Sequence, residues 1–290
     1  MTPLQRVQNL PIWRGAVRVE PLGGGITNVN FVAKDDAQKV VVRIGNDIPL
    51  HQILRFNEVS ASYAAHAAGV SPTVIYHEPG ALVMAFIEGR TMTVADFADD
   101  TILDQALALV ARAHRDIPQH LRGPALVFWV FHVLRDYAGT LRDAGSDYAS
   151  ALPELLRQAE QLEAAVGPID LVFGHNDLLP ANFLHDGERM WLIDWDYAGF
   201  NSPLFDLGGL AANNGLRDAQ EARMLRTYFE REPDVQLWRK YKAMKAAAAL
   251  RETLWSMVSE IYSEIDFDYA AYTSQNLSTY RAAFAAFENT

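Results

Sequence analysis

Three polar side chains near the middle of the chain have the types and the spacing that phosphoryl transfer requires. Asp177 and Asn182 stand five residues apart in the loop His-Asn-Asp-Leu-Leu-Pro-Ala-Asn, and Asp194 follows a short apolar run. A carboxylate at Asp177 can orient an attacking hydroxyl group and accept its proton, while an amide oxygen and a second carboxylate can hold Mg²⁺ on nucleotide phosphates. We therefore predict that Asp177 is the catalytic base and that Asn182 and Asp194 are magnesium ligands, both being hard oxygen donors.

A glycine-rich segment, residues 22–28, lies between two predicted strands far upstream of this loop. Glycines let the backbone approach phosphate oxygens closely and direct N–H groups toward them. A hairpin turn without a ligand has the same local pattern, but together with the downstream loop the segment favours phosphate binding. The predicted contacts come from Gly24, Gly25, Thr27 and Asn28.

Two charged residues complete the predicted nucleotide site. Arg43 lies on the third predicted strand, and Glu58 lies on the helix that follows. In one template for phosphoryl transfer, a basic side chain on a strand contacts the phosphates, and a glutamate on a helix orients that side chain. An arginine at this position offers a rigid fork of donors to phosphate. A solvated helix face is the alternative interpretation of Glu58.

Two residues near the loop are expected to have structural roles. We expect His175 to support the loop rather than to transfer protons. Asp206, in the sequence Phe-Asp-Leu-Gly, is interpreted as the N-cap of a helix. A hydrogen bond from Asp206 back to the loop is the alternative.

A set of aromatic residues lies downstream of the loop. Trp255 follows Glu252 by three residues on one predicted helix, and Tyr269 and Tyr272 have the same spacing. With Tyr197, aromatic faces beside a carboxylate would form a box for an amine or a quaternary ammonium group. Aromatic residues at helical spacing are more often part of a core, and both interpretations stay open.

The elements around these residues predict the fold. Residues 15–45 contain strand-like runs, residues 52–68 form an alanine-rich helix that Gly69 ends, and further strands are expected at 74–77 and 81–86. The loop and two short strands are expected within residues 171–196. Helices are expected at 102–116, 125–143, 151–165, 217–231, 235–262 and 267–288.

This order of elements predicts an α+β fold of two lobes. We expect a small, β-rich nucleotide-binding lobe over residues 1–88 and a larger, mostly helical catalytic and substrate-binding lobe over residues 89–290. Glu88-Gly89-Arg90 is the expected hinge between them.

Composition narrows the class of protein. The 290 residues carry a formal net charge of −11 and no cysteine, which excludes disulfides and thiolate metal sites and argues against nonspecific nucleic-acid binding. A negative field favours a cationic second substrate.

The most apolar window, residues 125–134, is too short to span a bilayer and is interpreted as part of a core helix. The first residues do not read as a secretory signal, so we expect a cytoplasmic protein without membrane insertion.

With these residues in place, the chain resembles the choline/ethanolamine kinase family, within the wider aminoglycoside-phosphotransferase-like group of protein-kinase-like folds. The resemblance extends from about residue 10 to residue 280. The stretches that carry it include Leu-Pro-Ile-Trp at 10–13, the glycine-rich loop, Val-Val-Arg-Ile at 41–44, the loop at 175–184 and Ile-Asp-Trp-Asp-Tyr-Ala-Gly at 193–199.

The resemblance implies an ATP- and Mg²⁺-dependent transfer of the γ-phosphoryl group to a small amino alcohol. It also implies that the acceptor's ammonium group binds in an acidic and aromatic pocket. Asp196, Tyr197 and Trp255 match pocket positions of the family, and Glu252, Tyr269 and Tyr272 are looser matches. Choline or ethanolamine is the expected acceptor. The alternatives are an aminoglycoside, thiamine or sugar kinase of the same group, or a nucleotide-binding protein without catalysis.

Overall fold

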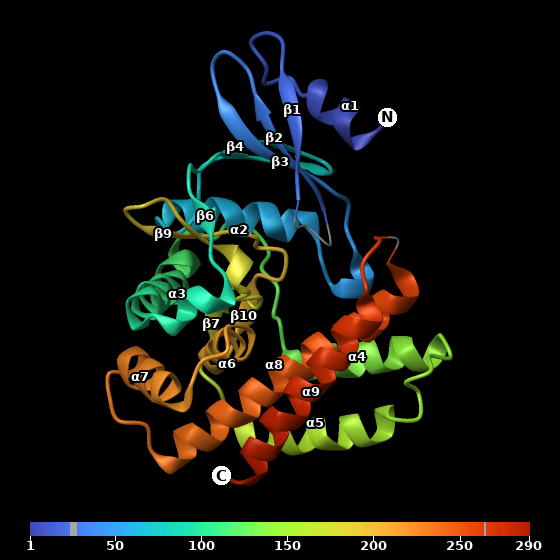
Figure 1. The fold of residues 1–290 in the computed structure, drawn as a ribbon, viewed down its shortest axis with the longest axis vertical. Helices are drawn as coiled ribbons and strands as arrows, with labels where there is room; N and C mark the ends of the chain where they lie inside the picture. Colours follow the sequence, from blue (N-terminus) through green and yellow to red (C-terminus); the bar gives the residue numbers. More distant parts are fainter. Residues whose placement is uncertain (24–27, 264) are drawn as a thin grey trace.

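A five-stranded antiparallel sheet forms the N-terminal part of the molecule (Figure 1). The structure is a computed structural model that describes residues 1–23, 28–263 and 265–290. The strands run in the spatial order β1-β2-β3-β5-β4. Their bounds are β1 Arg18–Leu22, β2 Val29–Lys34, β3 Lys39–Ile44, β4 Val74–Glu78 and β5 Ala81–Ala85.

The period-two pattern of the strands gives this sheet two different faces. One face packs with the short helix α1 (Pro3–Gln8) in a small core, to which β3 contributes Val40, Val42 and Ile44. Arg43 lies between these residues in sequence, so its side chain leaves from the opposite face, where helix α2 passes. The alternation of β3 therefore aims Arg43 at the space between the sheet and the rest of the protein.

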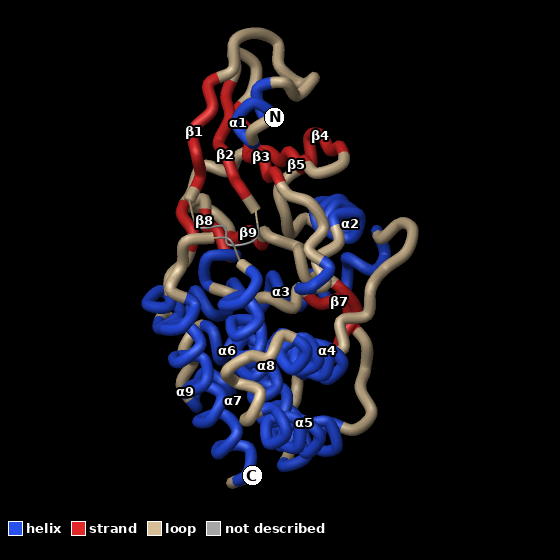
Figure 2. The backbone as a smooth tube through the Cα atoms, turned by 90° about the vertical axis from the view of Figure 1, so that its right-hand side faces the viewer, coloured by secondary structure: helices blue, strands red, loops and turns tan. Residues whose placement is uncertain are grey.

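Helix α2 (Arg55–Ala67) lies between the sheet and the helical body (Figures 1 and 2). Its buried alanines, with Ile53 before it and Val70 after it, belong to the core of the helical body rather than to the core of the sheet. Asn57 Nδ2 donates to the Ala198 carbonyl at 2.7 Å, and Leu192 N donates to the Val70 carbonyl at 2.9 Å. Hydrogen bonds thus attach both ends of α2 to residues 192–198, and its alanines pack into the core of the helical body.

The helical body surrounds α8, which packs against α4, α5, α6 and α9. Alanines at positions 243 and 246–249 let neighbouring helices approach, and a Cβ at Gly208 of α6 would lie 2.8 Å from the Lys245 backbone. The bounds are α3 Asp100–His120, α4 Val130–Asp143, α5 Leu152–Val166, α6 Pro203–Asn213, α7 Asp218–Phe229, α8 Val235–Tyr262 and α9 Tyr269–Glu288.

Short strands and 3₁₀ turns carry the segment that joins the sheet to these helices. Strands β6, β8 and β9 form one small sheet, and β7 and β10 form another. Their bounds are β6 Arg90–Thr91, β7 Val172–Gly174, β8 Phe183–His185, β9 Met190–Leu192 and β10 Gly199–Asn201, with turns η1 Pro49–His51, η2 Val94–Ala98 and η3 Pro180–Asn182.

The predicted α+β architecture is confirmed, with an antiparallel sheet followed by a mostly helical part. One helix prediction was wrong at its start. Residues 125–129 are not helical: Phe128 N donates to the Phe200 carbonyl at 2.9 Å, and Phe200 N donates to the Leu126 carbonyl at 2.8 Å. The apolar run that suggested a helix is extended here because it pairs with β10, and α4 begins only at Val130.

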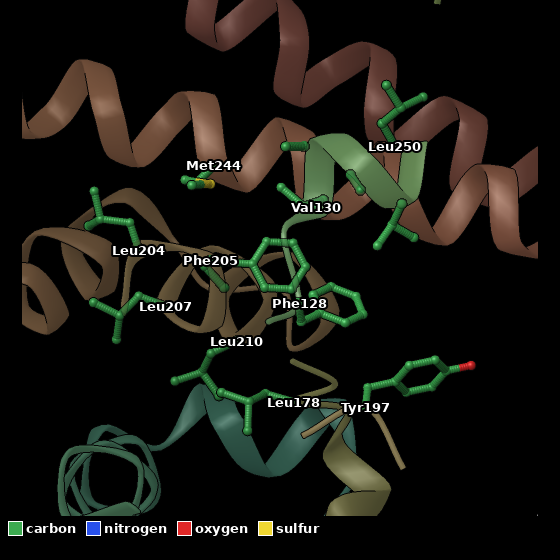
Figure 3. Close-up of a cluster of buried hydrophobic side chains, with 14 of the residues drawn as sticks. Phe128, Val130, Leu178, Tyr197, Leu204, Phe205, Leu207, Leu210, Met244 and Leu250 are labelled. Atoms are coloured by element: carbon green, nitrogen blue, oxygen red, sulfur yellow. The ribbon is translucent and has the colours of Figure 1, made fainter. Parts of the chain in front are cut away.

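Figure 3 shows the core cluster that this extended segment joins, where Phe128 packs near Phe205 of α6. Tyr197 lies at the edge of the cluster, with its hydroxyl group directed away from it. In the described part of the chain, no helix is long and apolar enough to cross a membrane.

Candidate active site

A carboxylate of α6 fixes the backbone of the loop that carries Asp177. Asp206 accepts hydrogen bonds from the backbone N–H groups of His175 and Asn176, both at 2.7 Å, and it contacts His114 Nε2 at 2.9 Å. Although burial acts in the opposite direction, the contacts with His114 and His175 lower the pKa of Asp206. Asn176 has a φ of +66°, a left-handed conformation that asparagine tolerates and that turns the loop sharply.

The interpretation of Asp206 as an N-cap was wrong. Ser202 is the N-cap of α6 and its hydroxyl accepts a hydrogen bond from Leu204 N at 3.3 Å. Asp206 lies within the first turn of the helix, so its side chain is free to reach outward to the loop. The alternative reading of Asp206, a hydrogen bond back to the loop, is the arrangement observed.

Asp177, Asn182 and the segment that carries Asp194 belong to one hydrogen-bonded unit. Asn182 Nδ2 donates to the Asp177 carbonyl at 2.8 Å, and Ile193 N donates to the Asn182 carbonyl at 3.0 Å. Asp194 follows directly with a φ of +70°, an uncommon conformation for a residue other than glycine. The structure thus brings the three predicted catalytic and metal-binding residues together.

His175 is buried beside this unit. Its Nε2 lies 2.9 Å from the Ile193 carbonyl, and its ring packs against Trp195 with centroids 4.7 Å apart. Burial lowers the pKa of His175, which favours the neutral ring. This placement fits a residue that connects the loop to the Asp194 segment.

Burial raises the pKa of Asp177, and the neighbouring Arg251 guanidinium opposes that shift. The Asp177 side chain is only 15% exposed, and Arg251 Nη1 lies 3.4 Å from its Oδ1. A carboxyl group with a raised pKa is a better proton acceptor than an ordinary surface aspartate, as general-base catalysis requires.

Arg43 meets three carboxylates where the sheet faces the helical body. Its guanidinium lies 3.0 Å from Glu58 Oε1, 2.9 Å from Asp194 Oδ1 and 3.2 Å from Asp196 Oδ1. Although burial opposes the charged form, these three carboxylates raise the pKa of Arg43. Glu58 is buried, so it does not lie on a solvated helix face.

A second arginine, which sequence reasoning did not identify, closes this network. Arg55 Nη1 donates to Glu58 Oε2 and to Asp196 Oδ1, both at 2.7 Å. Asn28 Nδ2 also donates to Asp196, at 3.1 Å. Asp196, predicted to contact the acceptor, therefore lies among the groups around Arg43. Gly24, Gly25 and Thr27 of the predicted phosphate loop lie outside the described residues.

A cavity of about 390 Å³ opens beside Arg43 and Asp194. This is a typical volume for a cofactor site. The rest of its lining is mostly apolar and includes Val41, Met84 and Phe86, which suits a flat aromatic base. A cavity that is apolar on one side and charged on the other matches a nucleotide.

The residues present fit a magnesium ion held together with nucleotide phosphates. Asn182 donates through its Nδ2, which leaves the side-chain oxygen as the atom for a ligand, and the Asp194 side chain is partly exposed. Among the described residues, no group of three or more His, Cys, Asp or Glu side chains could hold a metal ion by itself. Mg²⁺ commonly binds through one or two protein ligands plus phosphates, so this sparse donor set suits it.

The aromatic set comes together around the C-terminal half of α8. Trp255 Nε1 donates to the Tyr197 hydroxyl at 2.9 Å, and the Trp255 ring lies 6.1 Å from Tyr269 and 6.4 Å from Tyr272. Tyr272 donates to Glu252 Oε1 at 2.8 Å. Trp255 and Tyr197 are almost fully buried, whereas Tyr272 is partly exposed. The predicted aromatic residues therefore lie together in the structure, and the most buried of them, Trp255 and Tyr197, are also part of the hydrophobic core.

Three more residues at this cluster were missed from the sequence. Arg251 lies over the Tyr197 ring, 4.1 Å from its centroid. His51 packs against Trp255 at 5.2 Å, and Phe267 packs against Tyr272 at 5.6 Å. The spacing Arg-Glu-x-x-Trp on one helix face is the signal that would have added Arg251, while His51 comes from a distant turn and has no local signal.

Comparison with known proteins finds similar sequences and similar structures. The sequence model of the phosphotransferase enzyme family matches residues 18–244. Protein LicA of Haemophilus influenzae is 27% identical over 275 residues, covering 91% of this chain and 78% of that protein. Ethanolamine kinase 2 of Mus musculus is 27% identical over 306 residues, covering 93% of this chain and 77% of that protein.

A solved structure shares the whole fold. The crystal structure of a choline/ethanolamine kinase family protein from Mesorhizobium loti superposes with a TM-score of 0.79 at 28% sequence identity. The alignment covers 99% of this chain and 98% of that chain. Similarity therefore extends over both the sheet and the helical body.

Proposed function

This chain belongs to the phosphotransferase enzyme family, and from that premise we propose that it transfers the γ-phosphoryl group of ATP to the hydroxyl group of a small amino alcohol, choline or ethanolamine. The observation that carries the proposal is the hydrogen-bonded unit of Asp177, Asn182 and Asp194, which adjoins a nucleotide-sized cavity lined by Arg43. The acceptor class is supported by relatives that include an ethanolamine kinase.

Each residue of the unit has a task in this reaction. Asp177 orients the acceptor hydroxyl group and takes its proton at Oδ1 or Oδ2 as the acceptor oxygen bonds to the γ-phosphorus. The bond from the γ-phosphorus to the bridging oxygen breaks, and ADP leaves. Asn182 and Asp194 would hold Mg²⁺, which when bound neutralises charge on the phosphates. Arg43 contributes donors to the phosphates from its place between Glu58 and Asp194.

Charge and shape favour a cationic acceptor. Asp177 and Glu252 both lie near Arg251, so these three groups together carry one net negative charge when ionised. Aromatic rings of Tyr272 and Phe267 lie beside them, and Phe267 is 43% exposed. An ammonium group would gain both Coulomb attraction and contact with ring faces.

The test is ATP turnover, followed as ADP release, with choline, ethanolamine, thiamine, a sugar and an aminoglycoside as separate acceptors. Turnover that depends on choline or ethanolamine, and that requires Mg²⁺, is the expected result. Turnover only with thiamine, a sugar or an aminoglycoside would keep the phosphotransferase and overturn the amino alcohol. Absence of turnover with every acceptor, despite stabilisation by Mg²⁺-ATP in a thermal-shift assay, would indicate a nucleotide-binding protein without this catalysis.

A further inference from the structure

Arg251 lies at the acceptor side of the site, and the proposed function gives it no role beyond its contribution to the net charge. It lies on α8, is 3% exposed, and contacts both Asp177 and Glu252. Residues 175–182, the loop with the predicted base, contain no lysine or arginine. Arg251 is therefore a cation brought to Asp177 from a distant helix.

Arg251 balances the charge of Glu252. Its Nη1 donates to Glu252 Oε2 at 2.8 Å, while the Tyr272 hydroxyl donates to Oε1 at 2.8 Å. Each oxygen of this carboxylate, which is 12% exposed, already accepts a strong hydrogen bond. An incoming ammonium group thus meets a neutral ion pair rather than a free carboxylate.

Arg251 also covers the ring of Tyr197. The guanidinium carbon lies 4.1 Å from the Tyr197 centroid and 5.8 Å from the Phe128 centroid. That ring face is consequently filled by the protein's own cation. The aromatic surface left for an acceptor belongs to the more exposed rings of Tyr272 and Phe267, which pack together at 5.6 Å.

We propose that Arg251 is a specificity-determining residue that makes the acceptor site prefer an N-methylated ammonium group over a primary ammonium group. It does so by neutralising Glu252 and by filling the Tyr197 face. This inference rests on the proposed function, because it concerns which amino alcohol the same site accepts.

The physical reason is that a primary ammonium group and a trimethylammonium group need different contacts when they lose their water of hydration on binding. A primary ammonium group has three N–H donors, and it loses free energy on burial unless acceptors replace the water that held them. It also approaches an unpaired carboxylate more closely than a trimethylammonium group can, so it gains more Coulomb energy there. A trimethylammonium group needs no acceptors and binds well to aromatic surface. A neutralised Glu252 therefore removes the contact that the primary amine needs most.

The test begins with the unaltered protein. Values of kcat/KM are measured for ethanolamine, its mono- and dimethyl derivatives, and choline, with ATP and Mg²⁺ saturating. We expect kcat/KM to rise with each methyl group, and choline to exceed ethanolamine by about tenfold or more. A preference for ethanolamine would overturn this inference alone. No turnover with any of the four would overturn the proposed function and this inference with it.

The decisive variant is Arg251→Met, which replaces arginine by a long, unbranched side chain without charge. Turnover is expected to fall with every acceptor because Arg251 contacts Asp177. The ratio of kcat/KM for choline to that for ethanolamine should fall by about tenfold, since Glu252 becomes an unpaired carboxylate. A ratio that stays the same while both rates fall would overturn the proposal.

Two further variants separate the charge of Glu252 from its hydrogen bonding. Glu252→Gln should change the ratio by less than about threefold when Arg251 is present, but should reverse most of the shift in the Arg251→Met background, as a double-mutant cycle. Tyr272→Phe keeps the ring and Arg251 while removing the other contact of Glu252, so the ratio should again stay within about threefold. A shift in Tyr272→Phe as large as that in Arg251→Met would overturn the role of charge.

The experiment does not depend on recovery of active Arg251→Met. If that variant is inactive or unfolded, the proposal is tested by the ratio of kcat/KM for choline to that for ethanolamine, measured in the unaltered protein and in Glu252→Gln. A choline preference that Glu252→Gln leaves intact supports a neutralised Glu252. A choline preference that Glu252→Gln abolishes shows that a charged carboxylate recognises the head group, which contradicts the proposal.

Discussion

Glu58 stands between two arginines, with Arg43 at 3.0 Å and Arg55 at 2.7 Å, and all three side chains are largely buried. Removing one charge from such a group leaves the others uncompensated. We expect Glu58→Gln to lower the free energy of unfolding by about 2–4 kcal/mol and to raise the KM for ATP about tenfold, because Arg43 loses a fixed orientation. Urea unfolding and steady-state kinetics measure the two effects.

A matched control for this prediction lies on α5. Glu154 pairs with Arg157 at 2.6 Å, but both side chains are 55% exposed. An exposed pair contributes about 0–1 kcal/mol, so Glu154→Gln should change the free energy of unfolding little and leave the KM for ATP unaltered. Equal effects of the two variants would contradict the positioning of Arg43 by Glu58.

His51 gives the molecule a dependence of stability on pH. Burial, assisted by the Arg251 charge, lowers its pKa to about 4, whereas the pKa of an unfolded histidine is about 6.5. Between these values the unfolded chain binds more protons, so this contribution to stability is complete above about pH 6.5 and is lost as the pH falls toward 4.

We expect the free energy of unfolding to fall by about 1–2 kcal/mol through His51 between pH 7 and pH 5. In His51→Gln this part of the pH dependence should disappear, as measured by urea unfolding at the two pH values. His120→Gln, at an exposed position, should keep it. The same pH dependence in His51→Gln as in the unaltered protein would refute the assignment.

Among single residues, those in contiguous motifs were predictable and those joined only by folding were not. The spacing of Asp177, Asn182 and Asp194 is local enough to read from the chain, and the structure brings them together. The spacing of Arg251 to Trp255 places it on the aromatic face of α8, but the two residues in its contact with Asp177 are 74 positions apart, and no local pattern predicts that contact. The Arg55 contact with Asp196 spans 141 residues in the same way.

Helix α6 holds the catalytic loop through Asp206, which accepts from two consecutive backbone N–H groups at 2.7 Å. An amide has only one side-chain acceptor oxygen and no charge. We expect Asp206→Asn to lower the free energy of unfolding by about 2–4 kcal/mol and to lower kcat by about tenfold to a hundredfold, because the loop shifts. Thermal unfolding and turnover at saturating substrates measure both.

Ser202, the true N-cap of the same helix, is the control. Ser202→Ala should cost about 1 kcal/mol of stability through the loss of a cap. It should leave kcat unchanged, since Ser202 does not contact the loop. If both variants lower kcat to the same degree, general loosening of α6 rather than the Asp206 contact controls the loop.

At the level of elements, periodicity predicted most helices well and failed where tertiary contacts overrode it. Residues 125–129 are as apolar as a core helix, yet they are extended because they pair with Phe200 of β10. Asp206 has the residue type of an N-cap, but Ser202 and Pro203 begin the helix four and three residues earlier. Both differences depend on partners that a local pattern does not contain.

The whole molecule is divided by its cores rather than by chain order. The sheet and α1 share a small core, while α2 contributes Ala61, Ala64 and Ala65 to the core of the helical body. A segment that follows β3 in sequence thus belongs mainly to the larger core. We propose that α1 and the five-stranded sheet move as the smaller unit and that α2, although it lies within residues 1–88, stays with the larger one.

This division predicts an order of local opening. In native-state hydrogen exchange, backbone amides of β1, β2 and β3 should exchange at a lower free energy than amides of α2, which should exchange together with those of α3. Because the strands and α2 are measured in the same protein under the same conditions, each serves as the control for the other. Exchange of α2 in step with the strands would show that the first 88 residues open as one unit.

Phosphoryl transfer with Asp177 as the base is tested most directly by ³¹P NMR of ATP, Mg²⁺ and choline or ethanolamine, with the unaltered protein and with Asp177→Asn. We expect a new phosphomonoester signal that grows in equal amount with ADP. Asp177→Asn should slow the growth of this signal by about 10²–10⁴-fold, while the dissociation constant for Mg²⁺-ATP changes by less than about threefold. Inorganic phosphate as the sole product, or a phosphomonoester formed at an unchanged rate by Asp177→Asn, would contradict it.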